Sequence, residues 1–289
     1  METLYHYCST AAFHSIVESK SIHLSSLSLS NDTLEGKLVA DAVARLAERD
    51  GLNSSMRERL QSHLHFFDEY ADGLGLCLSE DDDLLSQWRG YAANATGVAI
   101  GFSRDYLQWL SKQWTPEAEV PGFKLDQVSY DRDRHDAEVE PTYSKILKLI
   151  DAGAFEFPRQ TILEEKSTEE EEEEERKRFK KLQMQLAVTT LTGFLGNLYT
   201  FKSPAFREER EWRLISHSLI GGDEVLSYRP AADRLVPYRK YDLKCLERQP
   251  IAEVVIGPKH LTPTNVIQAC LKLNGFGDVT VRRSEASYR

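Results

Sequence analysis

The stretch LYHYCSTAAFHSIVESKSIHLSS, residues 4–26, decides how the chain begins to fold. Its first six residues, LYHYCS, predict a β-strand, in which side chains alternate between two faces. Leu4, His6 and Cys8 then share one face, and the two tyrosines share the other. A histidine between two apolar neighbours either packs in a core with a hydrogen-bond partner or lines a pocket. Both alternatives are open on these residues alone.

The rest of this stretch predicts a helix and a second strand. TAAFHSIVESK has its large apolar residues at helical spacing, after a serine that suits an N-cap. SIHLSS then alternates like a short strand and ends in Ser25 and Ser26. We take the polar residues at these strand ends as candidates for one shared site.

The composition is that of a folded globular protein. The 289 residues are 41 % hydrophobic and 28 % charged, and this length permits one large domain or two small ones. The net charge of −10 argues against broad binding to nucleic acid, which needs clustered cations. A local basic groove is still compatible with that charge.

The cysteines and the apolar segments indicate a cytoplasmic protein. Cys8, Cys77, Cys245 and Cys270 stand far apart, without a CxxC or a Cys/His cluster, so we expect reduced thiols and no structural zinc. METLYHYCST lacks the pattern of a signal peptide. The most apolar stretch, residues 186–201, is too short and too polar to span a bilayer and predicts a buried helix. We therefore expect no membrane contact.

The order of the predicted elements favours a single α+β domain over residues 1–289, with a mixed or antiparallel strand core. Residues 35–70 and 105–198 are expected to be mainly helical additions to that core. The run STEEEEEEERKRFKK, residues 167–181, predicts an exposed helix with weak surface ion pairs. It continues without a break into apolar residues, so one long helix should begin exposed and end buried.

Several catalytic motifs are absent from the sequence. It has no GxxxxGK[ST], no GxGxxG after a strand, no HExxH, no GxSxG and no kinase motif set. These absences argue against P-loop hydrolysis, Rossmann-type redox chemistry and zinc proteolysis.

Two later stretches carry the remaining candidate residues. LSQWRGYA predicts a short helix with Trp88 and Tyr91 on one face. FKSPAFREEREWRLI predicts a strand with Glu209, Glu211 and Arg213 on one face. Two carboxylates and an arginine cannot face a dry core without partners. They indicate either an exposed edge strand with self-neutralising charges, or a carboxylate that an arginine holds and aims at a ligand.

The chain resembles the bacterial proteins grouped as domain of unknown function 2971. The resemblance lies in LYHYCS…SIHLSSLSLSNDTLEG, GLCLSEDDDLLSQWRGYAANATGVAIGFS, FKSPAFREEREWRLI and AEVVIGPKH, in this order. It runs from about residue 4 to residue 260, and the central acidic helix lies outside it. This family resemblance supplies no function.

A second resemblance implies an activity. A histidine on a first strand, a helix and a second strand ending in serines are similar to the start of ADP-ribosyltransferases of the His-Tyr-Glu type. A late strand of those enzymes bears a Glu-x-Glu or Gln-x-Glu pair, and Glu209 and Glu211 stand at a comparable position. The resemblance implies a split strand core and NAD as substrate. By this resemblance, Glu211 would stabilise the oxocarbenium-like transition state, His6 would donate to the adenosine ribose, and Tyr7 or Tyr91 would stack on nicotinamide.

The other residues of the implied nucleotide pocket are Ser25, Ser26, Trp88 and Arg213. Two departures accompany the resemblance. The second strand has serines where an aromatic residue or a Ser-Thr-Ser set is expected, and Arg213 can bind either glutamate and leave neither free. We also expect the strand with His6 to lie next to a strand from the last third of the chain.

Two function classes follow from these residues. The first is an NAD-consuming ADP-ribosyltransferase or NAD glycohydrolase inside a bacterial cell, of the kind used as a toxin or phage-defence effector, with a protein or nucleic-acid acceptor. The second is a non-enzymatic module that uses the same pocket to sense a nucleotide or a protein. A metal-dependent nuclease is a distant third. Asp32, Glu35, Glu209 and Glu211 would hold Mg²⁺, but their spacing does not require it, and no metal is expected.

Overall fold

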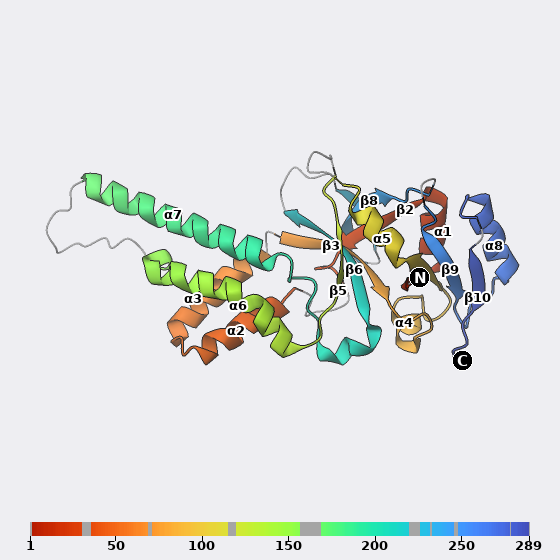
Figure 1. Ribbon diagram of the computed structural model, residues 1–289, viewed down its shortest axis with the longest axis horizontal. Coiled ribbons are helices and arrows are strands. Elements are labelled where there is room, and N and C mark those ends of the chain that lie inside the picture. Colours follow the sequence, from red (N-terminus) through yellow and green to blue (C-terminus); the bar gives the residue numbers. More distant parts are fainter. Residues whose placement is uncertain are drawn as a thin grey trace. The chain divides into compact units, whose positions relative to one another are not determined.

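The computed structural model has an α+β fold, as the sequence predicts (Figure 1). It describes residues 2–30, 36–68, 71–114, 120–156, 169–219, 226–231, 233–245, 248–277 and 279–288. Contacts divide the chain into two compact units. The first comprises Met1–Thr33, Asp72–Tyr130 and Lys202–Arg289, and the second comprises Leu34–Ala71 and Asp131–Phe201.

A mixed, mostly antiparallel sheet forms the framework of the first unit. In the described part of the chain its main path runs β10-β9-β4-β1-β3-β2-β8-β7, and β6 pairs with both β3 and β5. The pair β9 and β10 is parallel. The strands are β1 (Thr3–Cys8), β2 (Ser21–Ser26), β3 (Ala71–Ser79), β4 (Val98–Ser103), β5 (Lys124–Gln127), β6 (Glu211–Leu219), β7 (Ser227–Pro230), β8 (Leu235–Asp242), β9 (Ile251–Ile256) and β10 (Thr280–Arg283).

Helices accompany this sheet in the first unit and make up the second. Those of the first unit are α1 (Thr10–Ser19), α4 (Leu85–Gly90), α5 (Arg104–Ser111), the 3-10 helix η2 (Pro204–Glu209) and α8 (Thr264–Leu273). Those of the second unit are α2 (Leu38–Arg49), α3 (Ser54–Asp68), α6 (Arg132–Leu149), the π-helical segment η1 (Ile150–Ala154) and α7 (Glu169–Phe194).

Strand β1 alternates as predicted, and its two faces pack against different apolar clusters. Leu4 and Cys8 join the larger cluster, which includes residues of α1, α5, β3, β4 and β9. Tyr5 and Tyr7 join a smaller cluster on the other face, together with Trp88. The strand is therefore covered on both sides, which is why it carries large residues at nearly every position.

Strands β1 and β3 pair over a short length. Their register joins Tyr5 to Ser79, whereas β1 and β4 pair along the whole of β1. Next to Tyr5, the side chain of His6 binds the backbone carbonyl of Cys77, with Nδ1 2.9 Å from the oxygen. The two strands separate at this point and leave room for side chains between them.

Two positional predictions are wrong. Strand β1 lies between β4 and β3, so β3 separates it from the late strand β6. Glu209 is not on a strand but ends helix η2, and β6 begins at Glu211 after Arg210, whose φ is 43°. The left-handed backbone at Arg210 breaks the alternation that the sequence pattern predicts. Trp212 and Leu214 do pack in the larger cluster, on the face opposite Glu211 as predicted.

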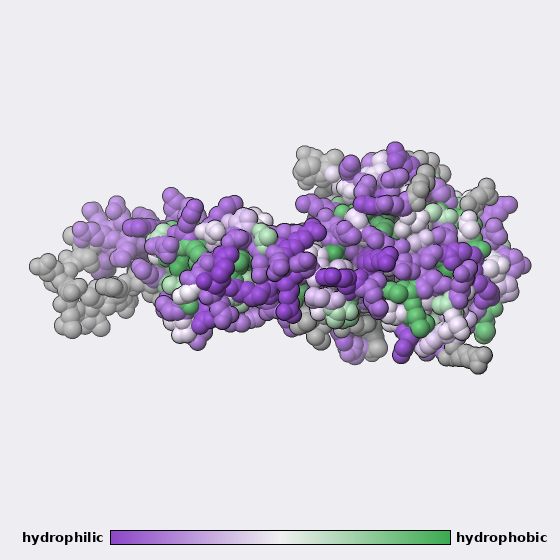
Figure 2. Space-filling view, turned by 60° about the horizontal axis from the view of Figure 1, so that its bottom comes forward, coloured by the Kyte–Doolittle hydropathy of each residue, from purple (hydrophilic) through white to green (hydrophobic). Residues whose placement is uncertain are grey.

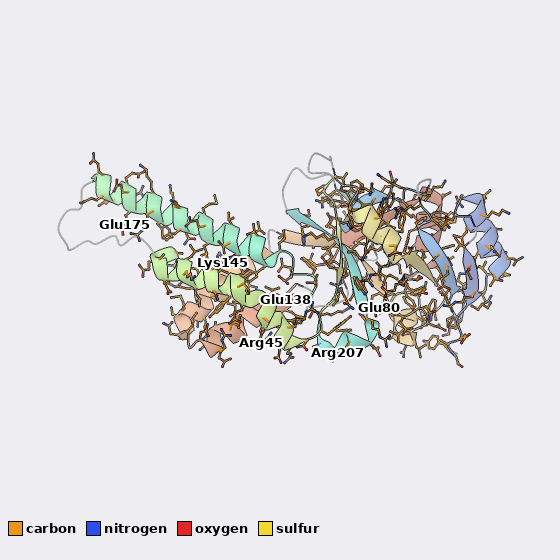
Figure 3. All side chains as sticks on the ribbon, in the orientation of Figure 1. Arg45, Glu80, Glu138, Lys145, Glu175 and Arg207 are labelled. Carbon is orange, nitrogen blue, oxygen red and sulfur yellow. The ribbon has the colours of Figure 1, made fainter. Side chains whose placement is uncertain are left out.

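The second unit contains the long helix predicted from the acidic run. Helix α7 begins with exposed charged residues, among them Glu175 (Figure 3), and its later part buries Leu186 and Phe194. Hydrophilic residues cover most of the molecular face in Figure 2, with apolar residues among them. Residues 105–130, expected in a helical addition, instead contribute α5 and β5 to the first unit.

Candidate functional site

A small pocket opens where β1 and β3 separate. Its cavity volume is about 50 Å³, and all of its lining residues belong to the first unit. They come from β1, β3, the α4 region and the η2–β6 junction, which lie far apart in the sequence. The lining residues are His6, Tyr7, Cys77, Leu78, Gln87, Tyr91, Glu209 and Glu211.

Glu209 and Glu211 share one lysine, which the sequence analysis missed. The ammonium of Lys202 lies 2.6 Å from Oε2 of Glu209 and 2.8 Å from Oε2 of Glu211. Its backbone N–H donates to the carbonyl of Ser129, and its ammonium lies 4.8 Å from the ring centroid of Phe206. The Lys202 ammonium therefore lies between the two carboxylates, at the place that a metal ion would take in a metal-dependent nuclease.

Arg213 holds the second carboxylate from the other side. Its Nε lies 2.7 Å from Oε1 of Glu211 and its Nη2 lies 3.0 Å from Oε2, which is a bidentate pair. None of the four side chains in this cluster, Lys202, Glu209, Glu211 and Arg213, is more than 9 % exposed. The charges therefore do not form the exposed edge-strand face that was one alternative, since β6 lies between β3 and β5.

The two carboxyl groups have opposite electrostatic environments. Burial alone would raise the pKa of Glu211, but Arg213 and Lys202 outweigh burial and hold that pKa at about 2. Burial raises the pKa of Glu209, and Lys202 only partly opposes it. Glu211 is therefore a fixed anion at neutral pH, whereas Glu209 takes up a proton more readily than an ordinary glutamate.

His6 is neutral and has a defined orientation. Burial lowers its pKa, although the hydrogen bond to the backbone of Cys77 opposes this. Since a carbonyl only accepts, Nδ1 must carry the proton that bonds to Cys77. Nε2 of the neutral ring is then an acceptor. A ligand hydroxyl at this position would donate to Nε2 of His6, whereas the resemblance implies that His6 donates.

The two tyrosines of the pocket differ in how strongly they are held. The hydroxyl of Tyr7 donates to the carbonyl of Asp81 at 2.9 Å and accepts from the N–H of Leu84 at 3.0 Å. Its ring packs edge-on against Trp88, with 4.8 Å between centroids. Tyr91 is 43 % exposed, and burial and the nearby Glu209 raise its pKa. Tyr91 is therefore better placed than Tyr7 to stack on a ligand ring.

Four residues assigned to the pocket from the sequence do not line it. Trp88 is fully buried in the smaller apolar cluster. Helix α4 ends at Gly90, so Tyr91 does not continue the helical face of Trp88. Ser25 and Ser26 lie on β2, beyond β3 from the pocket. The side chain of Arg213 is buried and binds Glu211, which lines the pocket.

Three further pocket residues, Cys77, Leu78 and Gln87, had no motif to mark them. Cys77 comes from β3, and its thiol donates a hydrogen bond that lowers the pKa of Glu211. Gln87 comes from α4 directly before Trp88. For Lys202 the sequence did give a signal. Two glutamates and one arginine leave one carboxylate without a cation. The nearby lysine in FKSPAF supplies the missing positive charge.

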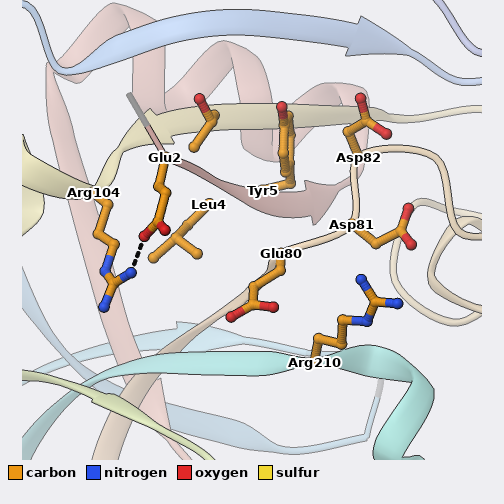
Figure 4. A pocket seen from close by; sticks show the side chains of 9 residues that line it. Glu2, Leu4, Tyr5, Glu80, Asp81, Asp82, Arg104 and Arg210 are labelled. Carbon is orange, nitrogen blue, oxygen red and sulfur yellow. Dashed lines mark hydrogen bonds and ion pairs between the residues drawn. The ribbon is translucent and has the colours of Figure 1, made fainter.

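A larger cavity of about 570 Å³ lies at the start of β1 (Figure 4). It has charges of both signs, and Arg104 forms an ion pair with Glu2. Glu80 accepts a hydrogen bond from Nε1 of Trp212 at 2.8 Å, and Asp81 connects the cavity to the small pocket through its bond to Tyr7. Most of its charged groups are bound to protein partners.

The described part of the chain shows neither a candidate metal cluster nor a membrane-spanning helix. It contains no group of three or more His, Cys, Asp or Glu residues that could hold a metal ion. Asp32 and Glu35, which the nuclease hypothesis needs, lie outside the described residues. No helix within the described ranges is long and apolar enough to cross a membrane.

Comparison with known proteins supports a relationship to one family. The family described as Protein of unknown function (DUF2971) matches residues 87–214. This range is shorter than the resemblance in the sequence, and it includes helix α7, which that resemblance places outside. It contains Gln87, Tyr91, Glu209 and Glu211 of the pocket. Neither a curated protein nor a solved structure matches the chain, so no comparison bears on the similarity to ADP-ribosyltransferases.

Proposed function

We propose that the small pocket binds the nicotinamide end of NAD and that the protein cleaves NAD, as an ADP-ribosyltransferase or an NAD glycohydrolase. One observation carries this proposal. His6 and Tyr7 on the first strand line the same pocket as Glu209 and Glu211, about two hundred residues later in the chain. The pocket joins an aromatic ring, a neutral imidazole and an ionised carboxylate, which suits a cationic pyridinium on a ribose.

The chemistry needs a fixed negative charge. The bond between C1′ of the ribose and the pyridinium nitrogen breaks, and its electron pair leaves with nicotinamide. Positive charge develops on the ribose, and the preorganised carboxylate of Glu211 stabilises it. Water or an acceptor nucleophile then bonds to C1′, and its proton passes to a base. Glu209 takes up a proton readily because burial raises its pKa, so we assign it that role.

The pocket side chains would hold the substrate as follows. Tyr91, which is partly exposed, stacks on the nicotinamide ring. Nε2 of His6 accepts from a ribose hydroxyl. The pocket is small, so only part of the nicotinamide end would enter it and the rest of the dinucleotide would extend outside. Such an activity in a bacterial cytoplasm is that of a toxin or a phage-defence effector, with a protein or nucleic acid as acceptor.

A second candidate function is nucleotide or protein sensing without catalysis. The cations already bound to the carboxylate of Glu211 favour this sensing function. Both oxygens of that carboxylate already bind Arg213, and one also binds Lys202. A carboxylate that is neutralised in this way stabilises a developing cation less than a free one. Under this alternative the same pocket binds the ligand and no bond breaks.

Nicotinamide release by the purified protein separates the two functions. NAD is supplied alone and then with cell extract as a source of acceptor. Catalysis predicts release that falls by about 10²- to 10³-fold in Glu211→Gln, the usual cost of losing one preorganised electrostatic group. Glu209→Gln should cost less. Exposed Glu208→Gln is the matched control and should keep full activity. Each variant is first shown to be folded by its circular dichroism.

The outcomes are distinct. NAD binding without release, in both conditions, supports the sensing function. Equal release by the wild type and by folded Glu211→Gln would remove Glu211 from the mechanism. If the protein neither binds NAD nor releases nicotinamide, NAD cleavage is contradicted and so is the sensing of NAD.

A further inference from the structure

The loop of residues 79–84 fixes one wall of the pocket. Its Asp81 carbonyl accepts from the hydroxyl of Tyr7 at 2.9 Å, and its Leu84 N–H donates to the same hydroxyl at 3.0 Å. Tyr7 therefore uses both its donor and one acceptor site on this loop. A movement of the loop would release the tyrosine ring that lines the pocket.

The same loop also binds the opposite wall. The hydroxyl of Ser79 donates to the carbonyl of Glu209 at 2.7 Å and accepts from the N–H of Asp81 at 3.0 Å. The N–H of Glu80 donates to the carbonyl of Arg210 at 3.2 Å. Loop 79–84 thus joins the first strand to the segment that carries the two glutamates.

Asp83 connects this loop to a distant part of the chain. Its Oδ1 accepts from Nε1 of Trp88 at 2.7 Å and from the hydroxyl of Ser284. Its Oδ2 accepts from the N–H of Glu285 at 2.7 Å and from the N–H of Ala286 at 3.1 Å. A carboxylate has about four lone-pair positions, and all four here are used on protein donors.

Segment 284–288 is itself held against the sheet. Ala286 and Tyr288 pack against the smaller apolar cluster that contains Tyr7. The hydroxyl of Tyr288 donates to Oδ1 of Asn94 at 2.7 Å, and the ammonium of Lys259 lies 3.9 Å from its ring centroid. The segment therefore has its own packing as well as its bonds to Asp83.

We propose that Asp83 is a positioning residue for the pocket, through which segment 284–288 fixes loop 79–84 against Tyr7 and Glu209. With the segment bound, both walls are held in the observed positions. With the segment released, the loop loses its anchor and the pocket opens. The proposal rests on the proposed function for the identity of the ligand, but the shape of the pocket can be measured without any ligand.

The test uses the thiol of Cys77, which is half-buried and lines the pocket. Its alkylation by iodoacetamide is followed by mass spectrometry in full-length protein, with half-buried Cys270 as internal reference. Asp83→Asn removes charged acceptor sites, and Ala286→Pro removes one N–H donor. Both should raise the Cys77 rate by about tenfold, because a hydrogen bond to a charged group shifts a local opening equilibrium by that order. Exposed Ser287→Pro is the matched control and should not change it.

Two further readouts distinguish positioning from a general loss of stability. Ser284→Ala should raise the alkylation rate of Cys77. Ser284→Thr should leave that rate near wild type, because threonine keeps the hydroxyl. If NAD is turned over, Ala286→Pro should raise KM more than it lowers kcat. The proposal is overturned if the Cys77 rate is unchanged in folded Asp83→Asn and Ala286→Pro, or if the Cys270 rate rises equally. Failure of NAD turnover alone would contradict the proposed function and leave this test intact.

Discussion

The guanidinium of Arg213 binds the carboxylate of Glu211 through two nitrogens, with Nε 2.7 Å from Oε1 and Nη2 3.0 Å from Oε2. The pair lies two residues apart on β6, and both side chains are buried. Lys202 supplies the second cation and Glu209 the second anion. The cluster is therefore balanced in charge, and each member depends on the others to remain ionised in a buried place.

The first prediction follows from that dependence. Arg213→Ala should lower the free energy of unfolding by about 3–5 kcal/mol, because it leaves a buried carboxylate without its strongest partner. Urea denaturation monitored by fluorescence measures the change. Exposed Arg207→Ala is the matched control and should change stability by less than about 0.5 kcal/mol. A similar small change for both variants would show that the buried cluster is not needed for stability.

The second prediction concerns acid sensitivity. Burial opposes ionisation of Glu211, but Arg213 and Lys202 lower its pKa to about 2 from an ordinary 4.5. Because this pKa is lower in the folded protein than in the unfolded chain, the ionised group stabilises the fold above about pH 4.5. That contribution, about 3 kcal/mol, is lost as the pH falls toward 2. Glu209 acts in the opposite sense, since burial raises its pKa and favours the fold at lower pH.

Urea denaturation at pH 5 and pH 3 tests this difference. The wild type should lose more unfolding free energy between the two pH values than Glu211→Gln, which has no charge to lose at that position. Equal losses in the two proteins would mean that the pKa of Glu211 is not lowered by its partners.

The third prediction concerns the acidic start of α7. Replacing residues 169–175 by glutamine should change the unfolding free energy by less than about 1 kcal/mol, because exposed pairs contribute little. One such pair, Glu173 with Lys177, has 3.7 Å between its charged atoms and both side chains are more than half exposed. Thermal denaturation and any measured activity should stay near wild type. A loss of several kcal/mol, or of activity, would reveal a partner for this surface.

The fourth prediction assigns ligand stacking to Tyr91. Tyr91→Ala should weaken NAD binding by about tenfold, the order expected for one aromatic pair beyond its buried area. Tyr91→Phe keeps the ring and should bind nearly as wild type. Isothermal titration calorimetry gives both dissociation constants. Equal loss in the two variants would point to the hydroxyl and away from stacking.

The strand pattern of the sequence was a good guide where side chains alternate. It places Leu4 and Tyr5 on opposite faces, and it assigns Glu211 and Arg213 to one face of a strand, as the structure has them. It fails at Glu209, because a left-handed residue ends the strand pattern, and no composition signal marks a positive φ in an arginine.

The site was harder to predict than the fold. His6 and Glu211 meet in one pocket, but Ser25 is separated from it by β3, and strand order cannot be read from local patterns. Trp88 and Tyr91 were given one helical face, yet α4 ends between them. Cys77 joins the pocket only because β1 and β3 diverge, which depends on long-range pairing.

Protection of Cys77 by NAD tests the central claim most directly, since it reports where NAD binds whether or not catalysis follows. The alkylation rate of Cys77 by iodoacetamide is measured with and without saturating NAD, with Cys270 as reference. We predict that NAD slows the reaction at Cys77 severalfold and leaves Cys270 unchanged. An unchanged Cys77 rate at NAD concentrations that saturate binding would contradict the assignment of this pocket to the nucleotide.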